Sequence, residues 1–286
     1  MNIIKNLLKT LPGVRWFLDM KKQLCMIRFQ VTQQTRIQQQ IYRQTLLSAR
    51  LQEGKIFPAA YEHQTFSQNG EDGILREILR RLEIDTGRFV EIGSGDGLEN
   101  NTRLLLETGW EGVWFDGSKE CCAIASKANQ KHLENKSLKI KQSLVTAENV
   151  NELILKMEVH PDTEVLSLDL DLNTYHIWEK IETINPLIAI IEYNGFMPAD
   201  SKWIAEYNPH GYWNGDFNMG AALKPLDELG KKKGYKLIGC DLSGANAFFV
   251  LNNLADRHFP ETPDAISLFE PAQPFLLNNP EHRRDL

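Results

Sequence analysis

The sequence lacks most of the features that mark membrane-spanning, secreted or nucleic-acid-binding proteins. Its four cysteines form no C-x-x-C pair, so neither a zinc site nor a disulfide framework is indicated. Charged residues such as Lys5, Lys9 and Arg15 interrupt the apolar N-terminus, which excludes a membrane span or a signal peptide there. A basic excess is also missing, because the net charge is −6, and this argues against nucleic acid as a partner. We expect a cytoplasmic protein that binds small molecules or sugars.

Residues 1–55 contain almost no glycine after Gly13 and are rich in Gln, Arg and Leu, which predicts a long helix. Four apolar residues fit a seven-residue spacing, Leu24, Ile27, Val31 and Ile41, but Gln34 and Gln38 interrupt it. Three alternatives remain open: a polar helix on its own domain, self-association through residues 20–55, or a peripheral place at the inner membrane through an amphipathic segment at residues 3–17. We expect residues 1–55 to be dispensable for cofactor binding.

From residue 56 to the end, strand-like and helix-like segments alternate, which predicts one α/β domain with a doubly wound, Rossmann-like, mostly parallel sheet. We expect parallel strands at 88–93, 112–117, 138–145, 164–171 and 186–194, with a closing antiparallel edge at 235–251. Helices are expected at 74–84, 98–109, 121–135, 147–157, 174–184 and 220–234. The proline-containing tail after Asn252 is expected to be irregular.

The segment FVEIGSGDG, residues 89–97, is the most informative part of the sequence. Glu91 stands at the tip of the expected first strand, and three glycines follow, Gly93, Gly95 and Gly97. Glycines adopt conformations closed to other residues and let the backbone approach a ligand closely. At the carboxyl end of a first strand, such a turn is typical of a nucleotide-like ligand site.

Two ligand classes compete for this turn. The dinucleotide pattern G-x-G-x-x-G would need glycine where Leu98 stands, and the carboxylate of Glu91 would repel a pyrophosphate. A carboxylate suits the cationic methionine part of S-adenosylmethionine instead. Asp116, 19 residues after Gly97, is placed to accept hydrogen bonds from ribose hydroxyls. The pattern favours S-adenosylmethionine over NAD or a turn without a ligand.

Five segments together resemble the FkbM-type class I methyltransferases, and among them a bacterial branch associated with polysaccharide biosynthesis. They are FSQNGEDGIL (66–75), FVEIGSGDGLENNTRLLLETGWEGVWFDGS (89–118), LSLDLDLNTYHIW (166–178), IIEYN (190–194) and GYKLIGCDLSGANAFFV (234–250). The resemblance covers roughly residues 57 to 251. It implies O-methylation of a sugar hydroxyl and places Gln68 near the methionine end of the cofactor. Asn101 and Ser143 complete the predicted cofactor site.

Carboxylates follow two neighbouring expected strands, where an acceptor would bind. Asp169, Asp171, Glu192 and Asn194 offer the oxygen ligands that Mg²⁺ or another divalent cation prefers. Relatives in the resemblance have D-x-D-G-N-D-Y here, whereas this chain has Leu172 and Thr174, which weakens a metal site. The alternative is that Asp169 and Asp171 cap the next helix. A hydroxyl nucleophile needs a base, and we expect His176, whose neutral form takes a proton near pH 7, with Glu192 as its rival and Asp169 as a further catalytic residue.

The segment 203–220 is long, aromatic and polar, as sugar-binding loops are. Tyr207, Tyr212, Trp213 and Asp216 are the candidate acceptor contacts, although the aromatic residues could equally pack beneath the loop. The sequence as a whole predicts an S-adenosylmethionine-dependent O-methyltransferase that acts on a glycan, glycolipid or sugar-nucleotide precursor. A methyltransferase for a small metabolite, or a non-catalytic scaffold that keeps the fold, remains an alternative.

Overall fold

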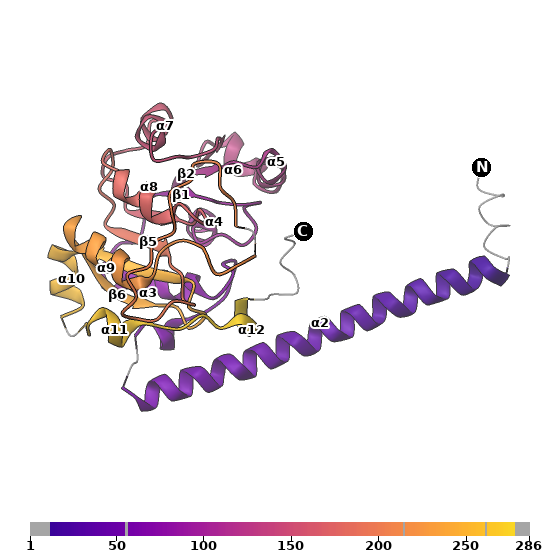
Figure 1. Cartoon of the computed structure of the whole chain (residues 1–286). Coiled ribbons are helices and arrows are strands. Elements are labelled where there is room, and N and C mark those ends of the chain that lie inside the picture. Colours follow the sequence, from indigo (N-terminus) through magenta and orange to yellow (C-terminus); the bar gives the residue numbers. More distant parts are fainter. Residues whose placement is uncertain (1–11, 55–56, 214, 261, 278–286) are drawn as a thin grey trace.

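The computed structural model describes residues 12–54, 57–213, 215–260 and 262–277 (Figure 1). Its centre is a seven-stranded sheet with the strand order β3-β2-β1-β4-β5-β7-β6. The strands are β1 (Arg88–Ile92), β2 (Glu111–Asp116), β3 (Leu138–Gln142), β4 (Val165–Leu168), β5 (Ile188–Glu192), β6 (Tyr235–Cys240) and β7 (Asn246–Leu251). The first five are parallel, and β7 runs antiparallel to β5 and β6. The predicted fold class, a doubly wound sheet with an antiparallel edge, is confirmed.

Helices cover both faces of the sheet. They are α2 (Pro12–Gln52), the short η1 (Ala59–Tyr61), α3 (Glu71–Arg81), α4 (Arg103–Glu107), α5 (Lys119–Ala128), α6 (Gln130–Glu134), α7 (Val150–Lys156), α8 (Thr174–Lys180), α9 (Leu223–Lys232), α10 (Asn252–His258), α11 (Ala265–Leu268) and α12 (Pro274–Leu277). Side chains of α7, α8 and α9 join the apolar core on one face, and those of α3, α4 and α10 join the core on the other.

Alternation along the strands explains why both faces are apolar. Phe89 joins one core, whereas its neighbour Val90 joins the other, and Ile190 and Ile191 divide in the same way. Successive side chains of a strand point to opposite faces, so a strand buried on both sides reads as a continuous apolar run. The strands are therefore packed on both faces, and this packing fixes the positions of their carboxyl ends, where the candidate site lies.

Three expectations about elements were wrong in detail. The helix expected at 98–109 begins only at Arg103, and the one expected at 121–135 divides at Asn129. The side-chain amide of Asn129 donates to the carbonyl of Ala125 at 2.9 Å, a local bond that competes with helix continuation. The tail expected to be irregular contains α10, α11 and α12.

The predicted long helix is confirmed as α2, and its C-terminal half is fixed to the domain. Arg50 donates to both carboxylate oxygens of Glu270 at 2.6 and 2.5 Å, and Tyr42 donates to Gln273 at 2.7 Å. Arg43 forms an ion pair with Glu62. The N-terminal half projects beyond the domain (Figure 1). Most of the segment expected to be amphipathic, residues 3–17, lies outside the described residues. No helix in the described parts of the chain is long and apolar enough to cross a membrane.

Candidate functional site

The predicted glycine turn lies at the carboxyl end of β1, in the middle of the sheet. Gly93, Gly95 and Gly97 have φ values of +88°, +57° and +69°, which side chains disfavour. A Cβ atom on Gly93 would lie 1.7 Å from the carbonyl oxygen of Asp169, so the close approach of this loop to the end of β4 requires glycine. A Cβ on Gly95 would meet nothing within 4 Å, so this residue borders open space. The turn therefore presents bare backbone to a ligand.

Glu91 has a different role from the one expected. Its side chain is buried and accepts hydrogen bonds from the Asn100 amide at 2.6 Å and the Thr102 hydroxyl at 2.5 Å. The backbone N–H groups of Asn101 and Thr102 donate to it at 2.9 and 3.1 Å. Burial raises the pKa of Glu91, and these donors act in the opposite direction. The carboxylate therefore orders the loop that leads into α4 and does not face the crevice.

This arrangement bears directly on the choice between the two ligand classes. In a dinucleotide site the pyrophosphate binds the N–H groups that open the helix after the glycine turn. Here α4 begins at Arg103, and the N–H groups just before it already donate to Glu91. The protein's own carboxylate occupies the place of the anion. Asn101, predicted to bind the cofactor, is likewise turned inward, where its amide donates to Ser167 at 3.1 Å.

Asp116 ends β2 beside the glycine turn. Its two carboxylate oxygens accept the N–H groups of Gly95 at 2.8 Å and Ser118 at 2.7 Å. Burial raises the pKa of Asp116, and the nearby charge of Asp169 adds to the increase. A carboxylate has about four lone-pair positions, so these two bonds leave capacity for ribose hydroxyls. Ser143 joins the neighbouring strand tip to this site, because its N–H donates to the carbonyl of Asp116 at 2.8 Å.

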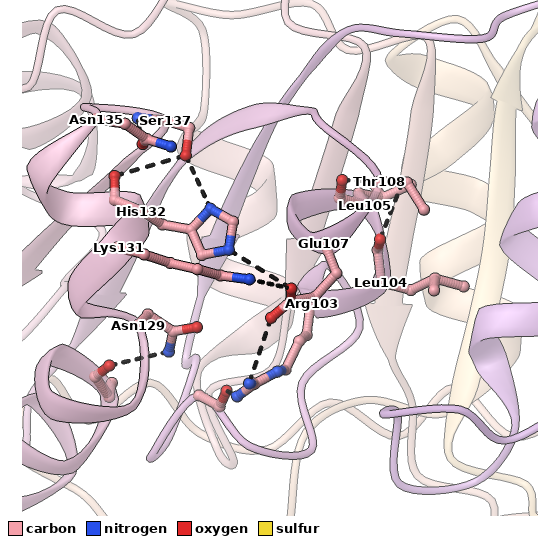
Figure 2. A network of polar contacts seen from close by, with 12 residues as sticks. Arg103, Leu104, Leu105, Glu107, Thr108, Asn129, Lys131, His132, Asn135 and Ser137 are labelled. Atoms are coloured by element: carbon pink, nitrogen blue, oxygen red, sulfur yellow. Dashed lines mark hydrogen bonds and ion pairs between the residues drawn. The ribbon is translucent and has the colours of Figure 1, made fainter.

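Arg103 holds the end of the glycine turn at Gly97, a role that the sequence did not indicate. Its guanidinium donates to the carbonyl of Gly97 at 2.5 Å and lies 5.1 Å from the centre of the Phe66 ring. Figure 2 shows the other side of this contact, where Glu107 lies between Arg103 and the α6 residues Lys131 and His132. This network ties the glycine turn to α4 and α6.

A cavity of about 430 Å³ opens next to the turn. Leu98 and Glu99 line it on the domain side, together with Phe66 and the predicted cofactor residue Gln68. The opposite wall consists of α2 residues, Arg36, Gln39, Gln40 and Arg43. The helix expected to be a separable extension is therefore one wall of a cavity beside the candidate cofactor site.

The four predicted metal ligands are not brought together as a ligand set. Asn194 is fully buried, and its amide donates to the carbonyls of Phe217 and Met219, both at 2.9 Å. Glu192 accepts a hydrogen bond from Thr174 at 3.3 Å. Among the described residues no three His, Cys, Asp or Glu side chains are grouped closely enough to hold a metal ion. The arrangement does not fit a hard cation, and Asn194 serves instead to hold the 217–219 segment.

The three predicted bases differ in availability. The Nε2 atom of His176 lies 2.9 Å from the carbonyl oxygen of Ala205, and because a carbonyl only accepts, this nitrogen carries the proton. The ring packs against Tyr207, with centroids 5.3 Å apart. His176 thus holds a loop. Asp169 is half-buried at the tip of β4, beside Gly93, and its carboxylate makes no hydrogen bond within the described parts of the chain. The charge of Asp169 contributes to the raised pKa of Asp116, so Asp169 lies near the end of β2 and the glycine turn.

The predicted acceptor residues divide into two groups. Tyr207 is a structural contact, because its hydroxyl donates to Glu148 at 2.6 Å and accepts the Ala147 N–H at 3.0 Å. Tyr212 and Trp213 are exposed, and so is Phe217, whose ring lies 4.9 Å from that of Phe196. Trp213 donates its indole N–H to the carbonyl of Asp216 at 2.6 Å. The loop after β5 therefore presents several aromatic faces at the carboxyl edge of the sheet.

No family model matches the sequence, and no curated protein matches it. Solved structures with a similar fold include the N-terminal domain of EvdMO1 with S-adenosylhomocysteine bound (12% identity, TM-score 0.42, 67% of this chain and 82% of that chain). A second is a SAM-dependent methyltransferase from Aquifex aeolicus, with 10% identity and a TM-score of 0.38 over 64% of this chain and 88% of that chain. A third is an O-methyltransferase family protein from Burkholderia thailandensis, with 12% identity and a TM-score of 0.40 over 62% of this chain and 55% of that chain. These similarities are remote, and the assignment of the fold class rests on the topology of the sheet.

Proposed function

We propose that this protein is an S-adenosylmethionine-dependent O-methyltransferase that acts on a sugar hydroxyl of a glycan, glycolipid or sugar nucleotide. One observation carries the cofactor class: Glu91 occupies the N–H groups that a pyrophosphate would need, while Asp116 remains open beside a bare glycine turn. An adenosine with a ribose and no phosphate suits this site. The backbone of the turn would contact the cofactor, and Gln68, which lines the cavity beside the turn, would bind its methionine end.

In the proposed reaction, the acceptor hydroxyl oxygen attacks the methyl carbon of the sulfonium. The new oxygen–carbon bond forms as the carbon–sulfur bond breaks, and the electron pair stays on sulfur, which leaves as the neutral thioether of S-adenosylhomocysteine. The carboxylate of Asp169 takes the hydroxyl proton. Its place just after β4, where its charge acts on Asp116, supports this role.

The acceptor class is supported by the loop after β5. Tyr212 and Trp213 expose 72% and 40% of their surfaces, and flat apolar faces of this kind stack on pyranose rings. They stand on the same edge of the sheet as Asp169. A small aromatic metabolite could use the same faces, so acceptor competition between sugars and aromatic alcohols separates the two classes.

Mass spectrometry of sugar nucleotides and lipid-linked glycans incubated with labelled S-adenosylmethionine tests the proposal directly. We expect a mass gain of one methyl group on a sugar.

Calorimetry should show S-adenosylhomocysteine binding and no NAD binding, and the reverse result would overturn the cofactor class. Asp169→Asn should lower turnover by about 10²-fold or more without a change in S-adenosylhomocysteine affinity. Asp171→Asn is the matched control, and equal losses in both variants would contradict a unique role for Asp169.

A further inference from the structure

The projecting half of α2 carries an apolar stripe that nothing in the described protein covers. The stripe consists of Trp16, Met20, Leu24, Ile27 and Val31, whose spacings of three and four residues return to one side of a helix. Trp16 is 65% exposed, and Ile27 and Val31 are each 54% exposed. Large apolar side chains exposed in a continuous row usually mark a contact surface.

The charge of α2 is opposite to that of the whole protein. Between Pro12 and Gln52 there are seven Lys and Arg residues and a single acidic one, Asp19, whereas the full chain has a net charge of −6. Lys21 and Arg28 flank the apolar stripe, about 80–100° around the helix from its centre. Arg43 and Arg50, which bind the domain, lie further round, away from the stripe. The domain therefore does not obstruct the stripe.

These features point to one kind of occupant. Pairing of the stripe with a second copy would bring two strongly basic helices together, and Gln34 and Gln38 would interrupt the seam. A bilayer with anionic headgroups has neither defect, because the acyl chains would receive the stripe while the headgroups would neutralise the flanking Lys21 and Arg28. We propose that residues 12–31 lie along the surface of an anionic membrane and hold the domain on its aqueous side.

Vesicle flotation of the full chain tests this proposal. We expect binding to vesicles of phosphatidylcholine with phosphatidylserine, little binding to phosphatidylcholine alone, and a decrease with added salt. Ile27→Asp should lower the binding constant for anionic vesicles about tenfold or more, because the apolar surface of the isoleucine no longer enters the bilayer. Phe29→Asp is the matched control: it makes the same change of charge two residues further, about 200° around the helix, at a side chain that is 65% exposed. Phe29→Asp should lower vesicle binding clearly less than Ile27→Asp does.

Light scattering and thermal melting accompany the flotation. Both variants should keep the melting temperature of the full chain, because neither side chain contacts the domain. No flotation with anionic vesicles, or equal losses in Ile27→Asp and Phe29→Asp, would overturn the membrane proposal. A dimer in solution that Ile27→Asp dissociates, without vesicle binding, would show instead that the stripe pairs with a second copy. None of these readouts depends on methyl transfer.

Discussion

Asp116 is the side chain on which cofactor affinity should depend most directly. Each of its oxygens already accepts one backbone N–H group, which leaves lone pairs on both oxygens for further donors. Asp116→Ala should weaken S-adenosylhomocysteine binding by about 1–3 kcal/mol, because two ribose hydrogen bonds are lost. Titration calorimetry measures the change, with Asp162→Ala as a control, because this 90% exposed carboxylate precedes β4, at the opposite end of that strand from the site. An affinity equal to that of the unaltered protein would mean that the ribose binds elsewhere.

Glu62 should make the stability of the protein depend on pH. Burial, opposed by Arg43 and reinforced by Asp241, raises the pKa of Glu62 from 4.5 to about 8. Because this pKa is higher in the folded than in the unfolded protein, the group stabilises the fold fully below pH 4.5. That contribution is lost as the pH rises to about 8.

We expect Glu62→Gln to flatten the decline in the free energy of unfolding over this range, by up to about 1.4 kcal/mol per pH unit. Urea unfolding at several pH values measures the slope. Some decline should persist in the variant, since burial also raises the pKa of Asp241, to about 7. An unchanged slope would show that Glu62 is ionised throughout.

At the scale of the element, α2 divides into two halves with different roles. A shortened chain that begins at Thr32 keeps the contacts of Tyr42, Arg43 and Arg50 with the domain. It should match the full chain in unfolding free energy and S-adenosylhomocysteine affinity, and lose vesicle binding. A chain that begins at Phe57 loses the hydrogen bonds of Arg50 with Glu270 and of Arg43 with Glu62, which should lower the free energy of unfolding by about 1.5–3 kcal/mol. Denaturant unfolding of the two shortened chains decides this, and equal stability would mean that the whole helix is dispensable for the stability of the domain.

At the scale of the whole molecule, the strand tips carry acidic residues without forming a ligand set. Asn194 uses its amide to hold a loop, and Glu192 bonds with Thr174. We therefore expect methyl transfer to continue in excess EDTA and to gain nothing from added Mg²⁺. A radiometric transfer assay measures this. Inactivation by EDTA that Mg²⁺ reverses would show that the ligands assemble only when the acceptor binds.

Local sequence patterns determined the fold class and the location of the glycine turn. Continuous apolar runs specify strands buried on two faces, and a strand tip followed by Gly93, Gly95 and Gly97 specifies a turn with positive φ values, because both signals lie within a few consecutive residues. Element ends were less predictable: residues 98–102 read as helix, yet the N–H groups of Asn101 and Thr102 donate to Glu91, and that of Leu98 donates to Asp96.

Only the tertiary structure decided what each polar side chain does. Ser167 contacts Glu91 from 76 positions away, His176 binds a carbonyl 29 residues further on, and Arg50 reaches Glu270 across 220 residues. A sequence motif shows which chemical groups are present, but their hydrogen-bond partners depend on which segments the sheet and helices bring together. For that reason the sequence favoured His176 as the base, with Glu192 as its rival and Asp169 as a further candidate. In the fold His176 binds a carbonyl and Glu192 bonds with Thr174, whereas the Asp169 carboxylate has no hydrogen-bond partner among the described residues.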